Sequence, residues 1–305
     1  MKPRRSILSV PGHVQKMHAK ALDSSADVVM LDMEDSVPLD AKEAARAQVV
    51  DSLLSMAWGD KTVAVRINGL DTGYGYQDIL AVAEAAGGVV DTIVVPKVDH
   101  PRDIHCVSRL LDGIEMNRGI EAPIGIEASI ESAAGLEQVS RTACASRRLK
   151  TLIFGIADYS ASIGARLVSI SGHGEKEDEI YPGHRWHFPL SRVVMASKAH
   201  GLMAIDAPYG NFKDIEGLKK SAAMAAALGF NGKWVIHPGQ IDAVNAVFSP
   251  SAEDLSRAER VIKAHEEAVR AGRGAVAVDG RMVDNATIRL ARQLWEQARY
   301  LKLRR

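Results

Sequence analysis

Two carboxylates occupy equivalent positions in the middle of the chain. Glu131 and Asp158 each follow a short apolar run, at 123–128 and 151–155, and about one helix length of sequence separates them. Carboxylates that converge at neighbouring strand ends suit a hard divalent cation, which prefers oxygen ligands. The alternative is that one carboxylate ends a strand and the other caps a helix. The elements around them must decide between these hypotheses.

Short apolar, β-branched runs recur along the chain and predict buried parallel strands. They lie at 7–10, 28–33, 62–67, 92–96, 123–128, 151–155, 203–206 and 233–238. Alanine-rich amphipathic segments between them, such as 40–56, 76–87 and 214–229, predict helices. This alternation predicts an α/β fold, a (β/α)₈ TIM barrel over residues 1–248. A doubly wound sheet is the alternative, but no G-x-G-x-x-G or P-loop motif follows any strand.

Polar and charged side chains follow almost every predicted strand. The strand ends carry Pro11 with Gly12, Glu34 with Asp35, Arg66 with Asn68, Lys97, Glu131, Asp158, Asp206 and His237. In a TIM barrel the chemistry lies at the carboxyl ends of the strands. We expect the strand interiors to lack such charges, so their concentration at the ends predicts an active site there.

The last part of the chain, residues 249–305, is a predicted helical extension beyond the barrel. Helices are predicted at 251–272 and 287–302, with a short strand or loop between them. Such an appendage can act as a lid on its own barrel or contact a neighbouring subunit. Asp284 precedes the final helix, where the simplest role is an N-cap. A polar and aromatic insert, 171–188, is a second candidate lid or subunit contact.

The overall composition excludes several partner classes. Thirty-eight basic and 38 acidic residues leave no formal net charge, so we expect no nucleic-acid or anionic-membrane partner. We find no run of about 18 apolar residues and no signal peptide. The two cysteines, Cys106 and Cys144, lie far apart and predict neither a zinc site nor a disulfide framework. A reducing cytoplasm is the expected location.

Nine motifs, in order, carry a family resemblance. They are LDMEDSVPLDAKEAAR, VRINGLDT, VVPKV, IESAAG, FGIADYSAS, IDAPYGNFKD, LGFNGKWVIHPGQI, VFSPS and GRGAVAVDGRMVDNA. From about residue 4 to the last helix, the chain resembles the malyl-CoA lyase branch of the citrate lyase β-subunit-like family, in the HpcH/HpaI aldolase superfamily. The resemblance implies a Mg²⁺-dependent lyase, with Mn²⁺ as an alternative, that assembles as a homotrimer or homohexamer. Its expected reaction reversibly cleaves malyl-CoA or β-methylmalyl-CoA to glyoxylate and acetyl-CoA or propionyl-CoA.

The same resemblance assigns the metal ligands. Glu131 and Asp158 fall on the two residues that bind the metal directly in the family. Glu127, four residues before Glu131, lies on the same strand face and competes for this role by position alone. The IESAAG motif selects Glu131.

Other site residues also come from the resemblance. Glu34 and Asp35 match acidic positions next to the metal, where they would hold its bound waters. Arg66 matches the arginine that faces the substrate carbonyl. Asp284 matches an aspartate that a neighbouring subunit contributes as acid or base, which replaces the simple N-cap as our prediction.

The predicted coenzyme A contacts lie near the N-terminus. Lys20 falls on a basic position of the family, whereas Val14 stands where close relatives carry an arginine. Arg5 and His13 are substitutes for that arginine, or they are solvated surface residues.

Several activities remain open at this point. Lys97 at a barrel mouth would suit an aldolase that forms a Schiff base. The metal site would also serve a citramalyl-CoA lyase, which releases pyruvate, or a malyl-CoA thioesterase. A non-catalytic subunit that binds coenzyme A is the alternative from another class. Glyoxylate and pyruvate differ by one methyl group, worth only about 1 to 3 kcal/mol of discrimination.

Overall fold

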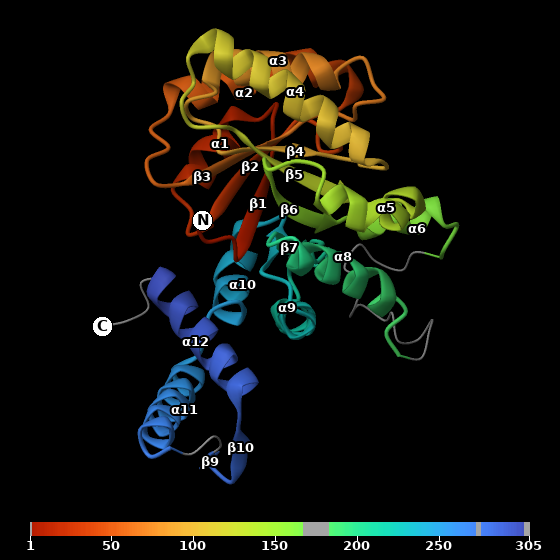
Figure 1. Ribbon diagram of the computed structural model, residues 1–305. Helices are drawn as coiled ribbons and strands as arrows, with labels where there is room; N and C mark the ends of the chain where they lie inside the picture. The colour runs from red at the N-terminus through yellow and green to blue at the C-terminus, as the bar shows by residue number, and fades with distance from the viewer. Residues whose placement is uncertain (1, 167–182, 273–275, 302–305) are drawn as a thin grey trace. The chain divides into compact units, whose positions relative to one another are not determined.

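Eight parallel strands form a closed barrel in the order β1 to β8 (Figure 1). The computed structural model describes residues 2–166, 183–272 and 276–301. The strands are β1 Ser6–Pro11, β2 Val28–Asp32, β3 Thr62–Arg66, β4 Thr92–Val95, β5 Gly125–Ile130, β6 Leu149–Phe154, β7 Met203–Asp206 and β8 Gly232–Val235. Pairing of Ser6 with Lys233 joins the first strand to the last. The predicted barrel is confirmed, and the open-sheet alternative is excluded.

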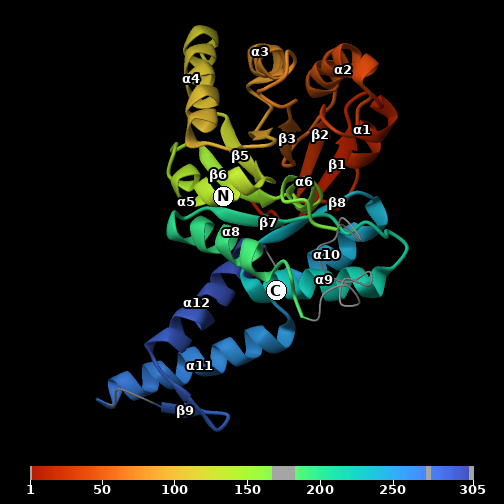
Figure 2. The same cartoon turned by 90° about the vertical axis from the view of Figure 1, so that its right-hand side faces the viewer.

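Helices follow the strands and surround the barrel (Figures 1 and 2). They are α1 Gln15–Leu22, α2 Lys42–Ser55, α3 Gly75–Ala86, α4 Pro101–Arg118, α5 Ala133–Ala143, α6 Ile156–Ser162, α8 His187–Ala199, α9 Ile215–Leu228 and α10 Ile241–Val247, with short 3₁₀ turns at Leu39–Ala41 and Pro238–Gln240. Local sequence explains their ends. In α4 the His100 side chain accepts from the first turn, Asp103 completes a capping box, and Gly119 ends the helix at φ 66°.

An apolar cluster contributed by most of the strands fills much of the barrel interior. It holds Ile7, Val28, Met30, Ala64, Val94, Ile153, Ile205 and Trp234. Side chains alternate between the two faces of a strand, so Asp32 shares the inward face with Met30, and Arg66 shares it with Ala64. The same periodicity that fills the core therefore places Asp32 and Arg66 inside the carboxyl-end mouth.

Buried charges are also present within the strands, so the expectation of uncharged strand interiors was wrong. Glu127 accepts from Arg4 and, at 2.6 Å, from the hydroxyl of Thr92. Lys233 pairs with Asp206 at 2.6 Å. Each of these buried charges has an opposite partner, because an unpaired one would be strongly destabilising. Glu127 is thus used in a structural ion pair.

The C-terminal residues 246–305 form a separate compact unit, distinct from residues 2–245. Its elements are α11 Ala252–Arg270, β9 Val276–Val278, β10 Arg281–Val283 and α12 Asn285–Tyr300. The strands form an antiparallel hairpin between the two predicted helices. A small core of Ala258, Val261, Val283, Ile288 and Ala291 holds the unit together. Its contact with a neighbouring subunit stays a prediction.

The structure describes only the end of the candidate lid 171–188. Residues 171–182 lie outside the described residues.

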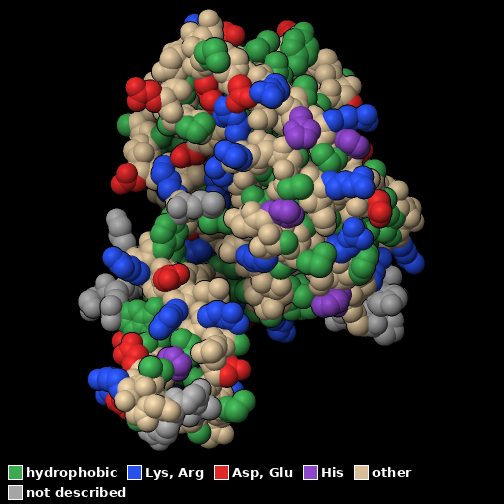
Figure 3. Space-filling view, viewed as in Figure 1, with side chains coloured by type: hydrophobic (Ala, Val, Ile, Leu, Met, Phe, Trp, Pro, Cys, Tyr) green, Lys and Arg blue, Asp and Glu red, His purple; other side chains and the backbone are tan. Residues whose placement is uncertain are grey.

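Lysine and arginine side chains are scattered over the face in Figure 3, with acidic side chains between some of them. Within the described ranges, we find no helix whose length and apolar character would let it cross a bilayer.

Candidate active site

Arg66 and Asp32 form a buried ion pair at the carboxyl ends of adjacent strands. The β2–β3 register sets the two residues side by side. Arg66 Nε and Nη2 donate to Asp32 Oδ1 and Oδ2, each at 2.7 Å. The guanidinium carbon also lies 5.3 Å from the centre of the Trp234 ring, within range of a cation–π interaction. Two strands and a ring therefore fix the arginine in one orientation.

This environment keeps the pair charged. Burial alone would lower the pKa of Arg66, but the charge and hydrogen bonds of Asp32 raise it. Burial alone would raise the pKa of Asp32, yet Arg66 and further hydrogen bonds hold it below its ordinary value. Sequence reasoning missed Asp32. The only signal in the sequence was the inward alternation that Asp32 shares with Met30 at the end of its strand.

Glu34 lies between two cations. Its Oε2 is 2.7 Å from Arg66 Nη1, and its Oε1 is 2.9 Å from Lys97 Nζ. Each Glu34 oxygen therefore has a cationic partner at the distance of a short ion pair. Burial raises the pKa of Glu34, which Arg66 partly offsets. Asp35 is more exposed and lies 3.5 Å from Arg66 Nη1.

A buried lysine holds the turn that carries Glu34. Lys42 Nζ, near the start of α2, donates to the carbonyl of Met33 at 2.9 Å and to that of Glu34 at 2.6 Å. Burial lowers the pKa of Lys42, although nearby carboxylates oppose this effect. The ammonium thus fixes the backbone of the acidic turn.

Glu131 comes directly after β5 and is 5% exposed. Its Oε1 accepts from the backbone N–H of Lys97 at 2.7 Å. Burial, followed by the charge of Glu34, raises the pKa of Glu131 to about 8; Arg66 opposes the shift and Asp158 adds to it. A nearby cation would stabilise the charged form of a carboxylate in this position and lower its pKa.

Asp158 lies in the first turn of α6, directly after β6. It is half-buried, and its charge raises the pKa values of both Glu131 and Lys97. Asp158 therefore faces the same region as these two residues. The structure brings together six sequence-predicted strand-end residues: Glu34, Asp35, Arg66, Lys97, Glu131 and Asp158.

The oxygen-rich cluster fits a hard divalent cation. Among the described residues, no group of three or more His, Cys, Asp or Glu side chains is arranged so that it could hold a metal ion. Mg²⁺ does not need three protein ligands, because it usually keeps several waters and uses one or two carboxylates. A partly hydrated cation beside the buried Glu131 carboxyl would favour its charged form and so oppose its raised pKa.

Other strand-end residues have structural contacts. Asn68 donates to Asp78 from its backbone at 2.9 Å and from its amide at 2.6 Å. His237 is exposed, caps a 3₁₀ turn and stacks on Phe212 with ring centres 4.9 Å apart. These contacts do not bring Asn68 or His237 into the carboxylate cluster.

The residues predicted to contact coenzyme A differ in their location on the barrel. Arg5 precedes β1, at the barrel end opposite the mouth, and pairs with Asp27 at 2.7 Å. This placement does not fit the predicted phosphate contact. Lys20 is exposed in the last turn of α1, and His13 is exposed after β1. For Lys20 and His13 the contact stays a prediction.

Asp284 is the N-cap of α12. Its Oδ1 accepts from the backbone N–H and from the hydroxyl of Thr287, both at 2.9 Å. These hydrogen bonds lower the pKa of Asp284. The capping role first expected from sequence is confirmed, and the acid–base role stays a prediction.

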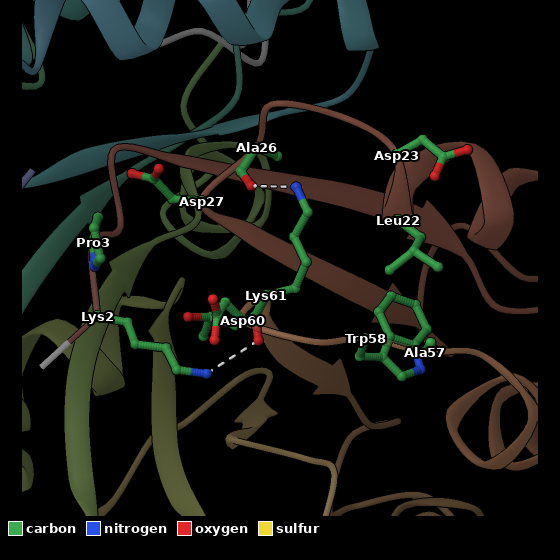
Figure 4. A pocket seen from close by; sticks show the side chains of 11 residues that line it. Lys2, Pro3, Leu22, Asp23, Ala26, Asp27, Ala57, Trp58, Asp60 and Lys61 are labelled. Atoms are coloured by element: carbon green, nitrogen blue, oxygen red, sulfur yellow. Dashed lines mark hydrogen bonds between the residues drawn. The ribbon is translucent and has the colours of Figure 1, made fainter. Parts of the chain in front are cut away.

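A pocket of about 540 Å³ lies away from this chemistry, at the amino ends of the strands (Figure 4). Its lining includes Lys2, Asp27, Trp58 and Lys61. Both lysine ammonium groups donate to backbone carbonyls, Lys61 to Ala26 and Lys2 to Lys61, each at 3.1 Å. With its cations occupied in this way, the pocket does not resemble the carboxylate site.

Comparison with known proteins gives consistent matches. Residues 5–238 match the family described as HpcH/HpaI aldolase/citrate lyase. The chain is 38% identical to an L-malyl-CoA/β-methylmalyl-CoA lyase of Cereibacter sphaeroides, covering 97% of this chain and 95% of that protein. It is 33% identical to a malyl-CoA/β-methylmalyl-CoA/citramalyl-CoA lyase of Chloroflexus aurantiacus, covering 99% and 89%. The structure resembles that of CitE from Mycobacterium tuberculosis in complex with magnesium, acetoacetate and coenzyme A, with a TM-score of 0.78, 29% identity and coverage of 97% and 98%.

Proposed function

The chain belongs to the HpcH/HpaI aldolase/citrate lyase family, and we propose that it is a Mg²⁺-dependent lyase of malyl-CoA or β-methylmalyl-CoA. It would release glyoxylate and acetyl-CoA or propionyl-CoA, reversibly. The chain is 38% identical, over nearly its full length, to an L-malyl-CoA/β-methylmalyl-CoA lyase, and this similarity supports the reaction. The observation that carries the proposal is the cluster of Arg66, Glu34 and Glu131 at one barrel mouth.

Glu131 and Asp158 are the proposed metal ligands, with Glu34 and Asp35 accepting from metal-bound waters. Their all-oxygen chemistry supports Mg²⁺, with Mn²⁺ as an alternative. When bound, the cation would chelate the oxygens of the 2-oxo acid half and act as a Lewis acid. The crystallised relative that contains magnesium supports this choice.

Arg66 is the proposed oxyanion-stabilising group. Cleavage of the carbon–carbon bond beside a thioester leaves an enolate, whose negative charge must be met by a preorganised cation. Asp32 holds Arg66 through two hydrogen bonds of 2.7 Å, and the ring of Trp234 lies against the guanidinium. Little reorganisation is then needed as the charge develops.

Asp284 is the proposed proton donor for the enolate. In the condensation direction the same carboxylate would accept the methyl proton. We propose that a neighbouring subunit of a homotrimer or homohexamer supplies it, and that Lys20 contacts a coenzyme A phosphate. Arg5 is not part of this proposed contact, because it pairs with Asp27 just before β1, at the barrel end opposite the mouth.

The Schiff-base alternative has little support from the geometry of Lys97. A lysine nucleophile must lose its proton, which desolvation favours. Burial does act to lower the pKa of Lys97, but the ion pair with Glu34 outweighs it and raises the pKa above its ordinary value. The side chain therefore stays protonated beside Glu34.

A Mg²⁺-dependent condensation assay tests the proposal. Glyoxylate and pyruvate are each combined with acetyl-CoA and propionyl-CoA, and the acyl-CoA products are identified by mass spectrometry. We expect turnover with glyoxylate that EDTA abolishes and Mg²⁺ restores. Turnover with pyruvate instead would favour citramalyl-CoA lyase, an activity named for one relative.

The cleavage direction separates the remaining alternatives. Malyl-CoA should give glyoxylate and acetyl-CoA in equal amounts. Free malate without glyoxylate would identify a thioesterase. Binding of coenzyme A without turnover of any acyl-CoA would indicate a non-catalytic subunit.

A further inference from the structure

Lys97 has an unusual backbone conformation at the end of β4. Its φ is 51°, in the left-handed region, where a non-glycine residue is disfavoured. In the described part of the chain only one other non-glycine residue, Asp279, has a positive φ. Backbone strain of this kind often marks a functional site, so its local contacts are informative.

The left-handed turn coincides with a contact to the proposed metal ligand. The Lys97 backbone N–H donates to Glu131 Oε1 at 2.7 Å. A hydrogen bond from an N–H to a carboxylate is short and strong. On the other side of the carboxylate, Oε2 lies against Gly155, in space that a Cβ at position 155 would fill. The Lys97 N–H is thus the contact that fixes Glu131, and Gly155 leaves room for its second oxygen.

The side chain of Lys97 contacts the second acidic group. Its Nζ lies 2.9 Å from Glu34 Oε1 and 3.9 Å from Asp35 Oδ1. Backbone and side chain of one residue thus connect the proposed metal ligand with the residues proposed to hold the metal's waters.

We propose that Lys97 is a positioning residue whose left-handed backbone aims the Glu131 carboxylate at the divalent cation. The inference rests on the proposed function, because it requires a cation at Glu131. The Lys97 amine takes no part in bond making.

A purely structural role gives a different expectation. The next residue, Val98, donates its N–H to Ser129 across the β4–β5 junction at 3.1 Å. If the left-handed turn served only this connection, its loss would lower thermal stability without a specific effect on metal affinity. Metal affinity is therefore the decisive readout.

Two neutral substitutions isolate the backbone. Lys97→Asn keeps a residue that tolerates the left-handed region, whereas Lys97→Val introduces a β-branched residue that strongly disfavours it. Both remove the ammonium, so the effect of its charge cancels in the comparison. Mg²⁺ binding to the metal-free, full-length chain is measured by calorimetry without substrate, with Mn²⁺ as a parallel probe.

We expect the Val variant to bind Mg²⁺ at least about tenfold more weakly than the Asn variant, the usual minimum effect of losing a partner of a metal ligand. Lys97→Ala, with a smaller steric penalty, should fall between them and replaces Lys97→Val if that variant does not fold. Equal affinities in folded variants would overturn this inference alone. Failure of the unaltered protein to bind either cation would overturn the proposed function and this inference together.

Discussion

The α-carbon of Gly155 lies directly against the carboxylate of Glu131. A Cβ at position 155 would overlap Glu131 Oε2 and the Glu131 Cβ. Gly155 is the residue between β6 and α6, and its N–H donates to the carbonyl of Ile130 at 3.1 Å. The absence of a side chain here is therefore a requirement of the neighbouring acidic residue.

Gly155→Ala should displace Glu131 and weaken the proposed metal site. We expect Mg²⁺ affinity to fall by about 10-fold to 100-fold, with turnover falling at least as far. Calorimetry on the metal-free protein measures the affinity. Gly113→Ala is a matched control, because a Cβ in that part of α4 meets nothing within 4 Å. Unchanged Mg²⁺ affinity in the Gly155 variant would show that Glu131 does not bind the cation.

Asp32→Asn should remove the charge that orients Arg66. The substitution leaves a buried guanidinium without its fully aligned anion, which costs about 3 kcal/mol of unfolding free energy. A misplaced Arg66 should also reduce kcat by about 10²-fold to 10³-fold. Urea unfolding and steady-state kinetics measure the two effects.

The exposed pair of Arg118 and Glu84, at 2.7 Å, provides the control for Asp32. Glu84→Gln should change the unfolding free energy by less than about 1 kcal/mol, because solvent screens a surface ion pair. If Asp32→Asn were equally mild in stability and kcat, the ion pair would not position Arg66.

The fold was readily predicted because local patterns determine it. Eight buried apolar runs separated by amphipathic helices specify a closed parallel barrel, and all eight strands formed within a few residues of their expected limits. The charged residues at the strand ends could also be predicted from the sequence. Inward-facing side chains at the carboxyl ends of the strands meet at the barrel mouth. Glu34, Arg66 and Glu131 were predicted on this basis, and the structure brings them together.

The unpredicted features depend on contacts between distant segments. Asp32 is the last residue of β2 and lay inside the predicted strand 28–33, and only the β2–β3 register shows that it faces Arg66. Arg5 is basic and close in sequence to the predicted coenzyme A contacts. It lies at the barrel end opposite the mouth, however, and there it pairs with Asp27. The left-handed backbone of Lys97 has no sequence signal, because glycine or asparagine would usually stand there.

His18 should make stability depend on pH. It is buried and hydrogen-bonded to Ser52 at 2.8 Å and to the Pro11 carbonyl at 3.1 Å. Burial lowers its pKa below 6.5, although the Pro11 contact partly opposes this. The unfolded chain then binds the proton more tightly, so the unfolding free energy should decrease as pH falls below about 6.5.

Comparison with His18→Gln isolates this effect from other titrations. Urea unfolding of both proteins is measured at pH 7.5, 6.5 and 5.5, values chosen around the ordinary histidine pKa of about 6.5. The stability advantage of the histidine protein should shrink toward the acid end. A constant difference across the three pH values would contradict a lowered pKa for His18.

Lys97 should not form a covalent adduct with a keto acid. Its ammonium is paired with Glu34 at 2.9 Å and its raised pKa keeps it protonated. Borohydride treatment in the presence of glyoxylate or pyruvate, followed by peptide mass mapping, should leave the Lys97 peptide unmodified. A reduced adduct at Lys97, formed only with keto acid, would replace the metal mechanism by the Schiff-base route.

Asp284→Asn should separate the two roles of Asp284. Asparagine is a good N-cap, so its side-chain oxygen can still accept from Thr287 and α12 should keep its start. An amide cannot give or take the proton of the enolate, so kcat should fall by about 10²-fold to 10⁴-fold. Mg²⁺ affinity should stay the same, because Asp284 is proposed to be no metal ligand.

Asp284→Ala completes this test because it removes the cap as well as the carboxylate. It should show the same loss of kcat as Asp284→Asn, together with a lower melting temperature. Turnover, Mg²⁺ binding and thermal unfolding are measured on both variants. Wild-type kcat in the Asn variant with a lower melting temperature in the Ala variant would leave Asp284 only its structural role, and the proton donor would have to be another residue.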